Sequence, residues 1–133
     1  MTPDARVAIG SDLGSADENT RWQAVIRLGD HIQDEPNDVW SVVAVWGCSD
    51  NADTQMAIAT CVLEHLLEHH FDMVFPLVEE LARRDSRFAD TVSSVWSFGQ
   101  TELPDNRKRL DALKLALRQN RGAAQQRDEA DER

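Results

Sequence analysis

Residues 65–69, with the sequence HLLEH, carry the side chains best suited to chemistry in this chain. If the segment is helical, His65 and His69 lie one turn apart on one side, where both imidazoles could bind a single metal ion. Glu68 would lie beside that ion as a base that activates water. Cys61 falls a further turn back on the same side. A cluster of Cys61, His65 and His69 is therefore the metal site that the sequence offers.

The same five residues resemble the H-x-x-E-H motif of inverzincin metallopeptidases. Inverzincins are much larger proteins that take a further Glu ligand from a distant helix, and this chain has no clear counterpart of that ligand. An imidazole at the border of an apolar stripe, where His65 and His69 fall, is also ordinary. We therefore expect no catalytic residue, no cofactor and no metal. The alternative is a metal-dependent or nucleic-acid-processing helical-repeat enzyme that uses Cys61, His65 and His69.

The helices that must position these residues follow from one apolar spacing, i, i+3, i+4, i+7, which recurs about every 35 residues in two interleaved series. The blocks of one series begin at Trp22, Ala59 and Val92, and those of the other begin at Val39, Val74 and Leu110. Each block is the buried stripe of an amphipathic helix. No segment alternates with period two, so we expect an all-α fold. Two helices per period, repeated about three times, predict a short α-solenoid of about six helices in three hairpins.

Turn and capping residues divide the chain between these stripes. Asp17 can cap the first helix and Asp53 the third. We expect one helical repeat domain over residues 15–120. Residues 1–14 and 121–133 carry no clear apolar stripe, so we expect a flexible N-terminal segment and a flexible charged tail.

Residues 17–29, with the sequence DENTRWQAVIRLG, resemble the second helix of a HEAT-type repeat, in which Asp, Arg, Ala and a Leu-Gly pair recur at this kind of spacing. Residues 53–63 resemble the same helix less closely, because they keep Asp53 and Ala57 but lack the Arg. The resemblance implies a HEAT-like or armadillo-like fold over roughly residues 17–120. It also implies that the helices near 17–33, 53–69 and 86–99 line a concave side, which in this family is often the binding side.

Charge is distributed unevenly along the chain, whose formal net charge is −10. No Lys or Arg occurs between Arg27 and Arg83, whereas acidic residues are frequent there. The last predicted helix is basic and carries Arg107, Lys108, Arg109, Lys114, Arg118 and Arg121. A net charge this negative opposes binding to nucleic acid, which is neutralised by Lys and Arg. The acidic middle favours a basic protein partner instead.

Aromatic and acidic side chains suggest which residues would contact that partner. Trp22, Trp46 and Trp96 fall in the apolar stripes and are expected in the core. Trp40 falls beside its stripe and is a candidate for a partly exposed anchor. The predicted partner-binding residues are Trp40, Asp50, Asp53, Glu64, Glu68 and Asp72.

These observations predict a non-enzymatic protein-interaction module. A bacterial immunity or antitoxin-type inhibitor fits, because a small acidic protein can mask the basic groove of a nuclease, and an adaptor fits almost equally well. Self-association of the basic helix with the acidic middle of a second copy is a further alternative. No apolar leader follows Met1 and no stretch is long and apolar enough to span a bilayer, so we expect a cytoplasmic protein.

Overall fold

The computed structural model describes residues 1–131, with side chains through Ala123. Its regular structure is entirely helical, and the described residues contain no β-strand, which confirms the predicted all-α class. The elements in chain order are α1 (Pro3–Leu13), α2 (Glu18–Gly29), α3 (Pro36–Trp46), α4 (Ala52–Ala57), the π-helix η1 (Ile58–Leu63), α5 (Glu64–Arg84), α6 (Ser86–Ser93), the 3-10 helix η2 (Gly99–Glu102) and α7 (Pro104–Asp131). Among these residues, no helix has both the length and the apolar character needed to cross a membrane.

The middle of the chain forms one long helix with a sharp bend. α4, η1 and the first turns of α5 run on without a break, and we call residues 52–69 the central rod. His70 then leaves the helical region, with φ −140° and ψ 44°, so α5 changes direction there. The imidazole Nε2 of His70 lies 3.0 Å from the carbonyl oxygen of Ile32, which ties the bend to the turn after α2.

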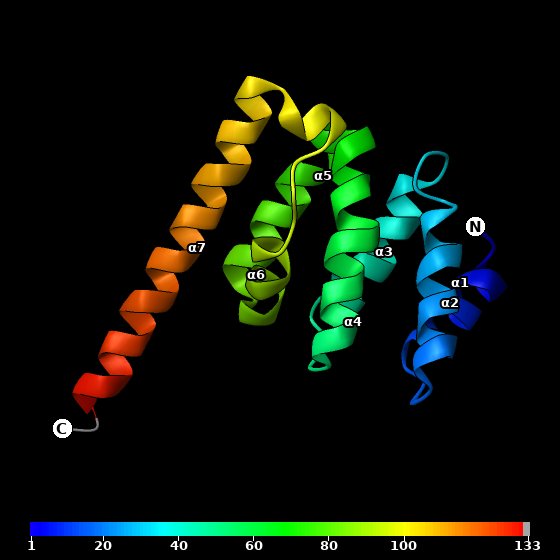
Figure 1. Cartoon of the computed structure of the whole chain (residues 1–133), viewed down its shortest axis with the longest axis horizontal. Helices are drawn as coiled ribbons and strands as arrows, with labels where there is room; N and C mark the ends of the chain where they lie inside the picture. The colour runs from blue at the N-terminus through cyan, green and yellow to red at the C-terminus, as the bar shows by residue number, and fades with distance from the viewer. Residues whose placement is uncertain (132–133) are drawn as a thin grey trace.

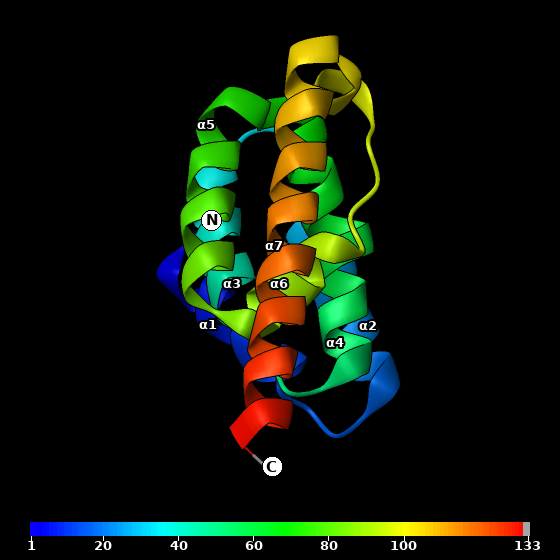
Figure 2. The ribbon, with the colours of Figure 1, turned by 90° about the vertical axis from the view of Figure 1, so that its left-hand side faces the viewer.

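The helices are arranged in two layers (Figures 1 and 2). α1, α3 and the part of α5 after His70 form one layer, and α2 and the central rod lie in the other. α1 packs on α2, α3 packs on the rod and on α5, and α6 packs on α5 and η1. α7 closes the far end of the molecule, against η2, α5 and α6.

Three helix starts repeat at a constant interval. Asp17, Asn51 and Asp85, which are 34 residues apart, cap α2, α4 and α6 with side-chain oxygens that accept backbone N–H groups of the first turn. The predicted cap at Asp17 is confirmed, whereas the cap of α4 is Asn51 and not Asp53. Hydrogen bonds from Thr20 hold the pKa of Asp17 below its ordinary value. These three helix starts are therefore evenly spaced along the chain.

Most of the predicted stripes form the core. Val25, Ala59, Val74 and Leu110, one from each of four stripes, are at most 3% exposed. Two tryptophans contradict the prediction, because Trp22 is 47% exposed and Trp96 is 72% exposed. The core-facing side of α2 is instead occupied by Ala24, Val25 and Leu28.

Trp96 leaves the core because α6 ends at Ser93, several residues before the predicted end at Gly99. Two side chains from other elements hold the backbone that follows. The Lys114 Nζ donates to the carbonyl oxygen of Val95, and the carboxylate of Glu64 accepts the N–H of Trp96. Because these long-range hydrogen bonds replace helical ones, residues 94–98 are irregular and the indole points out of the stripe.

Both ends contain helix, where the sequence patterns predicted none. Residues 1–14 contain α1, which begins at Pro3, and its Ile9 and Leu13 are buried against the rest of the core. This stripe is too short to be recognised as a period in the sequence. α7 continues past Asn120 to Asp131, through a stretch rich in the good helix formers Ala, Gln, Arg and Glu. The rest of the expected tail lies outside the described residues.

Candidate interaction groove

A surface with two separate hollows lies on the outside of the molecule, where α2 and the turn after it face the central rod. We call it the acidic groove. Its α2 side is formed by Glu18, Trp22, Val25, Gly29, Asp30 and Asp34, and its rod side by Asp53, Ala57, Cys61, His65 and His69. The groove contains two hollows, of about 120 Å³ beside Trp22 and about 390 Å³ beside the two histidines. Both hollows open to solvent.

The rod side of the groove is a row of every fourth residue. In an α-helix, four residues overshoot one turn by about 40°, so such a row winds around the helix. The π-helix η1 (Ile58–Leu63) lies in the middle of this row. A turn of π-helix holds more than four residues, so a step of four residues there covers less than one full turn. This shortfall offsets the excess rotation that the same step produces in the α-helical parts of the rod. The π-helix therefore keeps Asp53, Ala57, Cys61, His65 and His69 facing α2.

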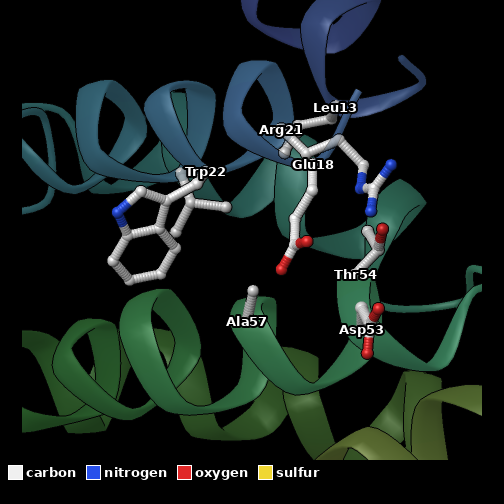
Figure 3. Close-up of a pocket in the computed structure, with 8 residues that line it drawn as sticks. Leu13, Glu18, Arg21, Trp22, Asp53, Thr54 and Ala57 are labelled. Atoms are coloured by element: carbon white, nitrogen blue, oxygen red, sulfur yellow. The ribbon is translucent and has the colours of Figure 1, made fainter. Parts of the chain in front are cut away.

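The hollow beside Trp22 combines an apolar wall with carboxylates (Figure 3). The Glu18 and Trp22 side chains reach from α2 into the space above Ala57. The Nη1 of Arg21 donates to the carbonyl oxygen of Ser15 at 2.9 Å, so this guanidinium is engaged by its own turn. Neither Glu18 nor Asp53 forms an ion pair with any described side chain. Two unpaired carboxylates thus flank an exposed indole.

The hollow at the other end of the groove holds imidazoles and carboxylates without any Lys or Arg. The Nδ1 of His65 lies 2.9 Å from the Oε1 of Glu68, and the Nε2 of His69 lies 3.4 Å from the same oxygen. Glu68 therefore holds both imidazoles. Asp30 is exposed at the α2 side of this hollow. An excess of negative charge is the dominant property of this end.

The surface continues from His65 onto the loop after α6. The ring of Phe98 stacks on the imidazole of His65 at a centroid distance of 5.9 Å. Gly99 follows with a φ of +51°, and a Cβ at this position would lie 2.5 Å from the Cγ of Glu68. Only glycine fits this close approach, which brings the loop down onto the rod.

The predicted site residues are only partly brought together. Cys61, His65 and His69 line the same hollow, as the sequence suggested, and Glu68 lies beside them. No group of three His, Cys, Asp or Glu side chains with the arrangement needed to hold a metal ion occurs among the described residues. Both Cys48 and Cys61 are free thiols, and burial raises the pKa of Cys48.

The predicted partner-binding residues divide into those that reach the acidic groove and those that do not. Asp53 lines it, whereas Asp50 precedes α4 and Asp72 follows the bend at His70, both exposed. Trp40 is half-buried, and its ring packs edge-to-face on Phe88 at a centroid distance of 5.8 Å. The ring therefore contacts the core. Glu64 is 4% exposed and is not accessible to a partner.

Sequence reasoning missed the α2 side of the groove. Glu18, Trp22, Asp30 and Asp34 were not among the predicted contacts, although the acidic stretch contains the two aspartates. The sequence pattern assigned Trp22 and Ile26 to the buried stripe, whereas both are exposed on α2. Large exposed apolar side chains at this spacing mark an interaction surface.

Glu64 instead belongs to a buried cluster that joins the rod to α7. Burial raises the pKa of its carboxyl group and lowers the pKa of the Lys114 ammonium, because each loses hydration. The two groups attract each other electrostatically, and each binds the backbone of residues 95–96. This cluster positions the loop and has no opening to the acidic groove.

The fold and the groove define an all-α protein with an acidic surface between α2 and the central rod. Residues 11–117 match a family of unknown function, DUF6869, and the chain belongs to this family. The matched residues run from α1 to α7 and include the whole acidic groove. Comparison with curated proteins gave no match, and comparison with solved structures gave none either.

Proposed function

We propose that the chain is a short HEAT-like α-solenoid that acts as a non-enzymatic protein-interaction module in the bacterial cytoplasm. The 34-residue interval between Asp17, Asn51 and Asp85 supports a repeat architecture. HEAT-like repeats bind partners along one side. The acidic groove lies on the side that the resemblance to this family assigns to binding.

The partner of the acidic groove is a basic segment of another protein. The observation that carries this proposal is the charge of the groove: Glu18, Asp30, Asp34 and Asp53 form no ion pair with any described side chain. Carboxylates grouped in this way repel each other and attract Lys and Arg. Trp22 and Ile26 add an exposed apolar surface for a side chain of the partner.

A bacterial immunity or antitoxin-type inhibitor and an adaptor both use such a surface. An inhibitor of this kind would cover the cationic substrate groove of its target, with electrostatic attraction raising the rate of association. The alternative of a metal-dependent or nucleic-acid-processing enzyme has less support. His65 and His69 both turn toward Glu68, and the basic residues lie away from them on α7.

The test is affinity capture with two variants that remove the same charge. Asp30→Asn/Asp34→Asn removes two carboxylates from the groove, and Asp50→Asn/Asp72→Asn removes two exposed carboxylates outside it. The wild-type protein should retain a basic protein from a bacterial lysate at low salt and release it at high salt. The groove variant should retain at least about tenfold less of that protein, whereas the control variant should retain the wild-type amount. Mass spectrometry measures the captured amounts.

Two results would contradict the proposal. Equal loss with both variants would mean that overall charge, and not the groove, attracts the partner. Full retention with both would mean that the partner binds elsewhere.

A further inference from the structure

A second hollow, of opposite charge, lies at the far end of the molecule. It has a volume of about 420 Å³ and lies between the end of α5, α6 and α7. We call it the basic cleft. Its charged lining consists of Arg83, Arg84, Lys114, Arg118 and Arg121, with Asp90 as the one carboxylate among the described lining residues. Figure 1 shows α7 diverging from α6 toward the C-terminal end of α7.

The cations face the basic cleft from two sides. Lys114, Arg118 and Arg121 are spaced by four and three residues, so they share one face of α7. Arg83 and Arg84 end α5 on the opposite side. Exposed carboxylates pair with Arg83, Arg84 and Arg121, and an anion inside the cleft would still be attracted from both sides.

Lys114 is engaged by the carbonyl oxygen of Val95, so the cations left for a ligand are the arginines. Arg83 and Arg84 form only exposed ion pairs with Glu79 and Glu80, at 3.6 and 3.9 Å, and such pairs are weak. Arg118 forms no ion pair with any described side chain. Arg121 pairs with Asp90, which removes most of the local effect of that carboxylate.

The size and the floor of the cleft indicate a small ligand. A volume of about 420 Å³ falls in the range of small-molecule sites, roughly 300 to 1,000 Å³. Ala82, Ala89 and Leu117 supply an apolar floor for the uncharged part of the ligand. The guanidinium group donates two parallel N–H groups, a geometry that matches the oxygens of phosphate.

We propose that the basic cleft binds a small molecule that carries two or more phosphate groups. Several phosphates match cations that reach the cleft from both α5 and α7. Nucleic acid is a poorer match, because it needs cations along an extended surface and the surroundings of the cleft are acidic, with Glu79, Glu80 and Asp111. This site is independent of the acidic groove and of its partner.

The test is calorimetric titration of the whole protein with sodium tripolyphosphate at low salt. Arg118→Gln removes an unpaired guanidinium from the cleft, and Lys108→Gln removes one positive charge from an exposed position of α7 outside the lining. The wild-type protein should bind at one site. Arg118→Gln should weaken binding about tenfold or more, as expected for the loss of hydrogen bonds to a charged group. Lys108→Gln should change the affinity less than about twofold.

Four results would overturn the proposal. In the first two, the wild-type protein binds no tripolyphosphate, or both variants weaken binding equally. In the other two, the protein binds citrate as tightly as tripolyphosphate, or binds only a single-stranded oligonucleotide. The Asp30→Asn/Asp34→Asn variant should bind tripolyphosphate like the wild type. This separates a failure here from a failure of the acidic-groove proposal.

Discussion

The acidic groove and the basic cleft differ in the packing beneath them as much as in charge. α2, α3 and α6 pack on the rod under the groove. The rod residues Ile58, Val62 and Leu66 are 0% exposed. α7, which forms one wall of the cleft, buries Leu110 and Leu113 near its start and leaves Leu115 49% exposed. The core thus fixes the shape of the groove, whereas one wall of the cleft is a helix that buries few of its side chains. A preformed surface binds its partner at a smaller cost in conformational entropy, whereas a ligand of the cleft would also have to order α7.

The largest expected effect separates the packing of the two regions. Leu66→Ala, in the rod, should lower the free energy of unfolding by about 2 to 5 kcal/mol, because it leaves a cavity in a fully buried site. Leu117→Ala, in α7, should lower it by about 1 kcal/mol or less, because that side chain is only partly buried. Urea unfolding of both variants measures the difference. If the two losses were equal, α7 would be as firmly packed as the rod and the comparison would fail.

A smaller effect is expected where the repeated caps begin the helices. Asn51 begins the rod and Asp85 begins α6, and each accepts two backbone N–H groups at 2.9 to 3.1 Å. Asn51→Ala and Asp85→Ala should each lower the free energy of unfolding by about 1 kcal/mol. Asp50→Ala, next to the first cap and exposed, is the control and should stay within about 0.5 kcal/mol of the wild type. A control as destabilised as the caps would mean that the repeated interval has no structural role.

Local sequence patterns predicted the helices whose stripes are long. Val74, Val78, Leu110 and Leu113 occupy the predicted spacing and are buried, because a 3.6-residue period is enough to identify a helix face. α1 was missed because its stripe has only Ile9 and Leu13, too few to define a period. The early end of α6 could not be predicted either, since it depends on Glu64 and Lys114, which come from distant parts of the chain.

The acidic groove shows the same limit on prediction. Its charge could be read from the sequence, because Lys and Arg are absent between Arg27 and Arg83. The residues on its walls could not, since the π-helix η1 has no local sequence signature and decides which side of the rod faces α2. Glu64, which directly follows η1, was predicted to contact a partner and is buried instead. A residue beside a stripe lies inside or outside according to which neighbour packs on it.

The smallest expected effect concerns the buried cluster that links the two regions, with Glu64 on the rod and Lys114 on α7. Glu64→Gln removes a charge whose burial is unfavourable, but it also removes the attraction to Lys114, so the net change in stability at neutral pH should be small. The informative quantity is the pH dependence. The pKa of Glu64 is raised above its ordinary value of 4.5, so between that pH and the raised pKa the native state binds more protons than the unfolded state.

It follows that Glu64 makes the free energy of unfolding fall as the pH rises through this window, and that the loss remains above it. The lowered pKa of Lys114 acts in the alkaline range, below 10.5, and the two effects can be measured separately. Urea unfolding at a series of pH values should show that Glu64→Gln gains stability relative to the wild type as the pH rises from about 4 to 7. A constant difference across this range would mean that the carboxyl group titrates as it does in the unfolded chain. The rod and α7 would then meet through a hydrated contact, and the firm packing of the rod would end before it reaches the basic cleft.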